Sequence, residues 1–172
     1  MKNILLIGMP SCGKSTVGVL LAKQLGYRFI DSDLLIQERT GKLLCELIAE
    51  RGVEGFLSLE NEVNASIEAE HAVIATGGSA IYGQRAMEHL KRNAVTVYLK
   101  IPFEALAVRL GDYTHRGVVM PAGYTLRQMY DERAALYEKY ADCTVDESLS
   151  AGLSDTVLRA LALCKEMGVG RS

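Results

Sequence analysis

The sequence predicts an α/β fold of three layers, in which helices cover both faces of a central, parallel, five-stranded sheet. One observation is that short apolar runs alternate along the chain with longer segments of helical periodicity, a pattern typical of strands joined by helical crossovers. Another is that residues 3–7, Asn-Ile-Leu-Leu-Ile, are apolar almost throughout, as expected for a strand buried on both faces. A chain of 172 residues suits one domain, 1–172.

Each expected element has a local signal. The strands are short apolar or β-branched runs, predicted at 3–7, 27–30, 71–75, 94–99 and 143–145. The helices have apolar residues three or four positions apart, predicted at 15–25, 34–52, 56–69, 82–92, 102–110, 126–140 and 154–167. Gly26 ends the first helix and Pro102 begins the fifth. The glycine-punctuated segment 111–123 is expected to lack regular structure.

Composition excludes several classes of function. There are 19 basic and 21 acidic residues, for a net charge of −2, so no strong field attracts nucleic acid or an anionic membrane. No apolar run reaches the roughly 18 residues of a membrane span. The four cysteines are irregularly spaced and show no metal-ligand pattern. We expect a cytoplasmic monomer whose partners are small molecules.

The segment after the first predicted strand matches the phosphate-binding pattern G-x-x-x-x-G-K-[ST] at every fixed position. In such a loop the backbone N–H groups and the following helix N-terminus hold a phosphate chain. Lys14 places a cation against the outer phosphates, and the Ser15 hydroxyl can join a Mg²⁺ shell. The predicted nucleotide-binding residues are Gly8, Met9, Pro10, Ser11, Cys12, Gly13, Lys14, Ser15 and Thr16.

Two aspartates follow the second predicted strand. Strand alternation turns Asp31 and Asp33 to the same side, and the carboxyl ends of parallel strands border the ligand crevice. One carboxylate can sit near Mg²⁺, and the other can accept a proton from a hydroxyl acceptor. The alternative is that Asp31 only caps the next helix.

Glycines and arginines supply the remaining candidates. Gly77 and Gly78 end the third strand, where open backbone N–H groups can meet a ligand; the alternative is a plain tight turn. Arg116 lies in a predicted flexible lid, about 111–124, that can close over the γ-phosphate, although a solvated loop charge is also possible. Arg133 can fork onto a carboxylate or pair with Asp131 or Glu138 on its own helix.

Together these motifs resemble the shikimate kinase family. The order matches: the glycine loop, D-x-D after strand two, T-G-G after strand three, a lid arginine, and E-R-x-x-L-Y-x-x-x-A-D. The likeness runs from about Asn3 to Asp146. It implies the P-loop kinase fold, with acceptor-binding helices at about 32–70.

The resemblance also implies a role for each candidate. Lys14, Ser15 and Asp31 would serve ATP and Mg²⁺. Asp33 would bind the acceptor's hydroxyls and help to deprotonate the attacked one. The remaining implied roles are acceptor binding by the Gly78 backbone, a catalytic lid role for Arg116, a carboxylate clamp at Arg133 and stacking near adenine by Arg109.

One position departs from the family pattern. The family has F-R-x-x-E in the helix that covers the acceptor, and its arginine is a second clamp on the shikimate carboxylate. Here Phe56 and Glu60 match, but Leu57 replaces the arginine. Losing a charge-assisted hydrogen bond costs about 1.5–3 kcal/mol. Either shikimate is still used, with a weaker clamp or one relocated to Arg51 or Lys42, or the acceptor is a related polyol.

Two further departures are Ser79, where the family has a third glycine, and "THRGVVMP" in place of the commoner R-P-L-L of the lid. The ATP side of the pattern is intact. The sequence therefore predicts ATP-dependent phosphoryl transfer to a hydroxyl of a small polyhydroxylated acid, with shikimate giving shikimate 3-phosphate. The alternatives are a kinase for another small hydroxyl compound, such as a sugar acid, and a non-catalytic ATP-binding module.

Overall fold

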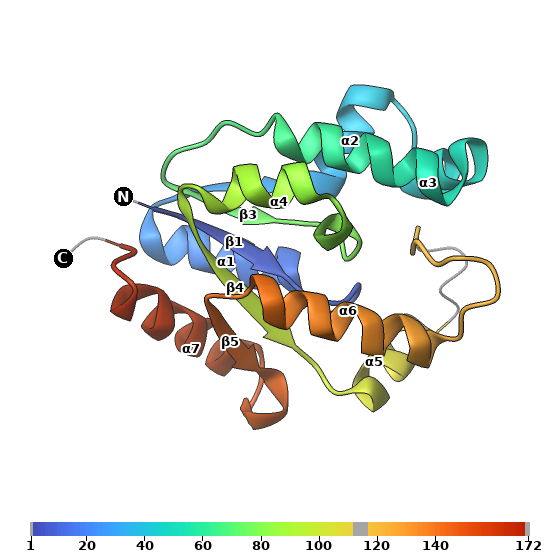
Figure 1. Cartoon of the computed structure of the whole chain (residues 1–172). Coiled ribbons are helices and arrows are strands. Elements are labelled where there is room, and N and C mark those ends of the chain that lie inside the picture. Colours follow the sequence, from blue (N-terminus) through green and yellow to red (C-terminus); the bar gives the residue numbers. More distant parts are fainter. Residues whose placement is uncertain (1, 112–116, 171–172) are drawn as a thin grey trace.

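The computed structural model describes residues 2–111 and 117–170. Its centre is a five-stranded sheet with the order β2-β3-β1-β4-β5, and every neighbouring pair is parallel (Figure 1). All five predicted strands are therefore confirmed, with boundaries shifted by a residue or two. The strands are β1 (Asn3–Ile7), β2 (Arg28–Asp31), β3 (Ala72–Ala75), β4 (Ala94–Lys100) and β5 (Cys143–Asp146).

Helices cover both faces of this sheet, which confirms the predicted three layers. In Figure 1, α1 and α7 lie against one face, and α4 and α6 lie against the other. The helices are α1 (Lys14–Leu25), α2 (Ser32–Thr40), α3 (Leu44–Ala65), α4 (Gln84–Lys91), α5 (Phe103–Leu110), α6 (Leu126–Tyr140) and α7 (Leu153–Glu166). Two short 3₁₀ turns are η1 (Ala80–Tyr82) and η3 (Glu147–Leu149).

Strand β1 is the middle of the core. All five of its residues are buried, because β3 and β4 pair with its two edges and helices cover its two faces. On β4, the ring of Tyr98 packs against that of Tyr137 from α6, with the centroids 5.1 Å apart. This packing fixes α6 against the sheet, and α6 carries one of the predicted site residues.

The boundary between the second and third helices was predicted wrongly. The break was expected near residues 53–55, but α2 ends at Gly41, which adopts a left-handed conformation with φ 67°. Helix α3 continues through the expected break, with only a kink at Gly52 (φ 69°, ψ 178°). Both glycines adopt positive φ, which other residues rarely do, and the sequence alone did not distinguish a helix end from a kink.

The predicted lid is only partly visible. Residues 112–116 lie outside the described residues, and the predicted catalytic Arg116 is among them. From Gly117 onward the chain has no helix or strand until α6 begins. The flexible lid at about 111–124 therefore stays a prediction.

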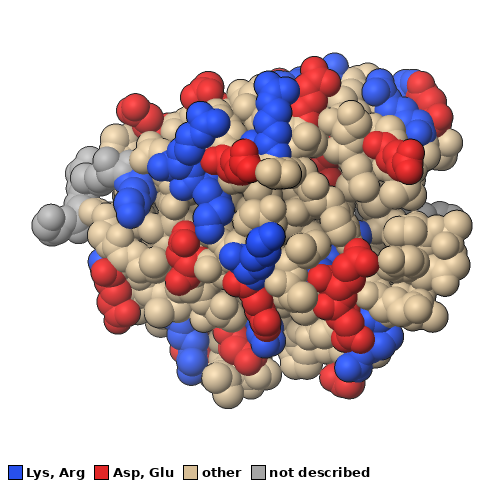
Figure 2. Space-filling model, viewed as in Figure 1, with Lys and Arg blue, Asp and Glu red and all other residues tan. Residues whose placement is uncertain are grey.

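The described helices include none long and apolar enough to cross a membrane. On the face shown in Figure 2, basic and acidic side chains are interspersed. That mixture agrees with the near-neutral charge of the chain.

Asn3 links the start of β1 to the connection before β3. Its Nδ2 donates to the carbonyl of Ala69 at 2.7 Å, and its Oδ1 accepts from the N–H of Ala72 at 3.0 Å. We expect Asn3→Ala to lower the free energy of unfolding by about 2 kcal/mol, because two backbone groups lose their partners. Urea denaturation measures this. The exposed Asn93 is the control, and Asn93→Ala should change stability by far less; an equal loss in both variants would contradict the assignment.

Candidate active site

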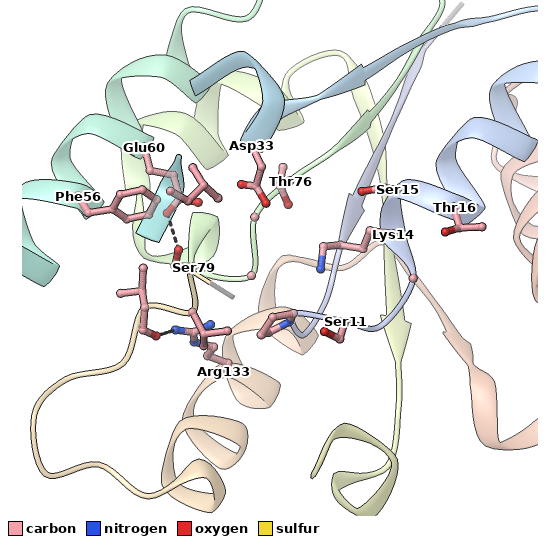
Figure 3. Close-up of a pocket in the computed structure, with 18 residues that line it drawn as sticks. Ser11, Lys14, Ser15, Thr16, Asp33, Phe56, Glu60, Thr76, Ser79 and Arg133 are labelled. Carbon is pink, nitrogen blue, oxygen red and sulfur yellow. Dashed lines mark hydrogen bonds between the residues drawn. The ribbon is translucent and has the colours of Figure 1, made fainter. Parts of the chain in front are cut away.

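A cavity of about 640 Å³ opens beside the glycine loop, at the carboxyl ends of β1, β2 and β3 (Figure 3). Its walls come from parts of the chain that are far apart in sequence. The first residue of α1 is Lys14, α2 supplies Asp33, and α6 supplies Arg133. Helix α3 adds Phe56 and Glu60, and the turn after β3 adds residues 76–79. Three of the predicted groups therefore lie around one space: the phosphate loop, the acidic residue and the clamp arginine.

The glycines of the loop are required by its geometry. Gly13 caps α1 in the left-handed region, with φ 91°. Gly8 has φ 149°, and a Cβ atom there would lie 2.6 Å from the carbonyl oxygen of Leu99. Any side chain at Gly8 would therefore force the loop away from β4. The loop has the strand-loop-helix context that a phosphate site needs.

Lys14 is buried at the floor of this loop. Its Nζ donates to the carbonyl oxygens of Gly8 at 2.8 Å and Met9 at 2.7 Å. The side chains of Met9 and Cys12 are packed in the core, so these two residues offer a ligand only their backbone groups. Burial raises the pKa of the Cys12 thiol, although Lys14 opposes the shift.

Asp31 and Asp33 reach the site differently from what was predicted. Strand β2 ends at Asp31 and α2 begins at Ser32, so strand alternation does not orient the pair. Asp31 caps α2, because its Oδ1 accepts from the N–H groups of Asp33 and Leu34. Its Oδ2 accepts a 2.6 Å hydrogen bond from the hydroxyl of Ser15. Asp31 thus caps the helix and also contacts the predicted magnesium ligand.

Asp33 lies in the first turn of α2 and faces the cavity. Burial, and then the charge of Asp31, raise the pKa of its carboxyl to about 6, while Lys14 acts in the opposite direction. A carboxylate with such a pKa is a better proton acceptor near neutral pH than an exposed aspartate.

The two glycines after β3 differ in their hydrogen bonds and in their role in the cavity. The N–H of Gly77 donates to the Ser32 hydroxyl at 3.3 Å, so the expectation of an open N–H at Gly77 was wrong. Gly77 instead provides room, since a Cβ atom there would lie 2.5 Å from Oε1 of Glu60 and 2.7 Å from Oδ1 of Asp33. The Gly78 N–H makes no hydrogen bond to another backbone group within the described residues. Its carbonyl accepts from the Tyr137 hydroxyl at 2.5 Å.

Arg133 is buried, with 1% of its surface exposed. It makes no pair with its helix neighbours, because Asp131 pairs with Arg127 and Glu138 pairs with Lys100. Its Nη2 instead donates to the carbonyl of Val119, and its guanidinium borders the cavity (Figure 3). Its Nε has no hydrogen-bond partner in the described structure, so this arginine retains donor capacity.

Leu57, where the resemblance implies an arginine, is not among the residues that line the cavity. Leu57 is partly buried and packs with an apolar cluster that includes Phe56 and Val119. Neither relocated clamp considered above lines the cavity: Lys42 pairs with Glu50, and Arg51 is exposed. Among the described residues, the cations at the cavity wall are Lys14 and Arg133.

Arg109 lies at a second cavity of about 320 Å³, on the other side of the glycine loop. Gly13 and Thr16 line both cavities, so the second one also borders the predicted phosphate site. Arg109 forms an ion pair with Glu147 at 3.0 Å. The place of Arg109 beside a nucleotide base stays a prediction.

Sequence reasoning assigned no role to three residues of this site: Glu60, Ser79 and Tyr137. The hydroxyl of Ser79 donates to Oε2 of Glu60 at 2.6 Å, and both side chains are buried. Tyr137 packs in the core and also donates a hydrogen bond to the Gly78 carbonyl. Its spacing of four residues from Arg133 was a usable signal, because such pairs share a helix face. The contact between Glu60 and Ser79 had no signal in sequence.

Comparison with known proteins identifies the family. The sequence pattern of the family described as "Shikimate kinase" matches residues 10–162. The chain belongs to the shikimate kinase family. A shikimate kinase of Clostridium botulinum (strain Eklund 17B / Type B) is 38% identical over 141 residues, covering 81% of this chain and 84% of that relative.

Solved structures of shikimate kinases share the fold of this chain. The enzyme from Acinetobacter baumannii, in complex with shikimate, has a TM-score of 0.83 at 30% identity, and 98% of this chain and 96% of that one are covered. The shikimate kinase from Aquifex aeolicus has a TM-score of 0.82 at 30% identity, with 98% and 99% covered. The predicted P-loop kinase fold is therefore confirmed, and the chain is a kinase of this family.

The close approach at Gly77 gives a test of the cavity. We expect Gly77→Ala to weaken acceptor binding by about tenfold or more, because the new methyl group displaces the carboxyl groups of Asp33 and Glu60. Nucleotide binding should change little, since the glycine loop is separate. Steady-state kinetics and calorimetry with MgADP measure the two effects. An unchanged KM for the acceptor would contradict the geometry.

Proposed function

We propose that this protein transfers the γ-phosphoryl group of ATP to a hydroxyl of shikimate, giving shikimate 3-phosphate. The observation that carries the proposal is the single cavity that joins the glycine loop to Asp33, Gly78 and Arg133. Membership of the shikimate kinase family supports both the reaction and the acceptor.

The nucleotide side fits ATP with Mg²⁺. We assign phosphate binding to the backbone of residues 8–16 and to Lys14, and base contact to Arg109. The Ser15 hydroxyl and the Asp31 carboxylate already lie 2.6 Å apart, and hard oxygen donors of this kind are what Mg²⁺ prefers. When bound, the ion would neutralise charge on the phosphates; Ser15 and Asp31 would hold it.

On the acceptor side, phosphoryl transfer depends mainly on alignment and charge. Asp33 would orient the attacked hydroxyl and accept its proton. The Gly78 N–H would hold the acceptor, and Arg133 would bind its carboxylate through donors such as the unpartnered Nε. Arg116, outside the described residues, is assigned the lid role by family resemblance.

Two alternatives stay open to direct test. A kinase for another small hydroxyl compound is favoured by one observation, the replacement of the family arginine by Leu57. A non-catalytic ATP-binding module is disfavoured by Asp33 and Arg133 in the cavity, because nucleotide binding alone needs neither. An ATP-coupled screen of acceptors that begins with shikimate separates the proposed function from these two alternatives. The expected single domain, acceptor-binding helices at about 32–70, monomeric state and cytoplasmic location remain predictions.

Lys14→Ala should abolish measurable turnover, because no other described cation lies within the glycine loop to balance the outer phosphates. Product formation from ATP and shikimate is the measurement. Lys23→Ala, on the exposed side of α1, is the control and should retain activity. Substantial turnover by the Lys14 variant would remove it from the mechanism.

Asp33→Asn should lower kcat by about a hundredfold or more, because an amide cannot accept the hydroxyl proton. Binding of MgATP, measured by calorimetry, should be nearly unchanged. The matched control is Asp131→Asn at an exposed site on α6. An unchanged kcat in the Asp33 variant would show that another group, or none, takes the proton.

A further inference from the structure

The acceptor end of the cavity contains a buried carboxyl group that the mechanism above does not use. Glu60 lines the cavity with 2% of its surface exposed. Its Oε2 accepts a 2.6 Å hydrogen bond from the Ser79 hydroxyl, a contact drawn in Figure 3. Its Oε1 faces Gly77, where it comes close to the Asp33 carboxyl. A polar group this deeply buried and aimed at a cavity is placed to contact the ligand.

Position 57 precedes Glu60 by three residues on α3, so the two positions are neighbours on one helix face. An arginine at 57 would therefore put a cation next to the Glu60 carboxyl. In this chain Leu57 turns to the apolar cluster instead, and the donor to Glu60 is the neutral hydroxyl of Ser79. Both residues are departures from the pattern that the resemblance implies; Ser79 contacts the Glu60 carboxyl group directly, and Leu57 lies one turn before it on α3.

We propose that Leu57 and Ser79 together set the acceptor specificity of this kinase. Ser79 is a positioning residue that holds Glu60 at the acceptor subsite through an uncharged hydrogen bond, and Leu57 adds no cation at the neighbouring position on α3. Recognition of an acceptor carboxylate then rests on Arg133 and is opposed by Glu60 when Glu60 is ionised. The pocket consequently loses part of its preference for an anionic acceptor over a neutral one when Glu60 is ionised. This inference rests on the proposed function.

The charges around Glu60 define a pH dependence. Burial raises the pKa of its carboxyl to about 7, the charge of Asp33 adds to the rise, and Ser79, Arg133 and Lys14 oppose it. Below this pKa Glu60 is neutral and does not oppose the attraction between Arg133 and the acceptor carboxylate. Above it, Glu60 is negative and repels the acceptor carboxylate. Affinity for an anionic acceptor should therefore fall as the pH rises through about 7, by about tenfold.

The experiment compares shikimate with its neutral methyl ester. Calorimetry on the full chain with MgADP present gives the Kd of each from pH 6 to 8.5. We expect the Kd of shikimate to rise about tenfold over this range, while the Kd of the ester stays constant. The ester has no carboxylate charge, so the comparison distinguishes repulsion of that charge from effects of pH that act on both ligands. Glu60→Gln should remove the part of the dependence centred near pH 7 and leave only the part that comes from Asp33, whose pKa is about 6. Ser79→Ala should move its midpoint to higher pH, because the ionised form loses a donor.

Leu57→Arg tests the other half of the proposal. The added guanidinium should move the midpoint to lower pH and tighten shikimate binding at pH 8 by about tenfold or more, with little effect on the ester. Ser58→Ala and Glu62→Gln, two exposed positions on α3, are the matched controls and should behave as the wild type.

The outcomes are distinguishable. A Kd for shikimate that follows the same pH profile in Glu60→Gln and Ser79→Ala as in the wild type would overturn this inference while leaving the proposed function intact. If shikimate fails to bind at every pH although MgADP binds, the proposed acceptor is wrong and this inference falls with it. If Ser79→Ala lowers the free energy of unfolding but does not move the midpoint of the pH dependence, Ser79 has a structural role only and its positioning role is overturned.

Discussion

The parallel pairing of β1 with both β3 and β4 is the constraint on which the site depends. It places β1 inside the sheet, with every residue buried, so the loop that follows has a rigid base. Because all strands run the same way, the segments after β1, β2 and β3 emerge at one edge. The glycine loop, the acidic turn and the Gly77-Gly78 turn therefore meet at this edge, although they are far apart in the sequence.

Charge at this edge is divided between two halves of one cavity. Lys14 and Ser15 line the half that suits phosphates and a hard cation, and Asp31 is hydrogen-bonded to Ser15 at its edge. Asp33 and Glu60 approach each other across Gly77 in the other half, facing the buried Arg133. Two buried carboxyl groups so close to each other disfavour double ionisation. The pKa values of both are raised as a result of burial and neighbouring charge, which suits them to proton exchange near neutrality.

The fold and the reaction follow the family, whereas the residues around Glu60 concern recognition of the acceptor. Fold, loop and phosphoryl chemistry follow the shikimate kinase family over most of the chain. At the acceptor end, Ser79 donates to Glu60, and Leu57 packs in the apolar cluster around Phe56 and Val119. A pocket can thus retain its reaction while its preference for an anionic acceptor shifts, because transfer and acceptor recognition use separate groups.

The sequence by itself determined the sheet, the helices that cover it and the phosphate loop, because these depend on local periodicity and on a motif of fixed spacing. It also identified Asp31, Asp33, Gly78 and Arg133 as candidates. Only the tertiary structure decided that Asp33 reaches the cavity from the first turn of α2, that the Gly77 N–H is already bonded, and that Ser79 holds Glu60. Those facts depend on contacts between residues 19 to 45 positions apart, and no local pattern records which side chains such contacts bring together.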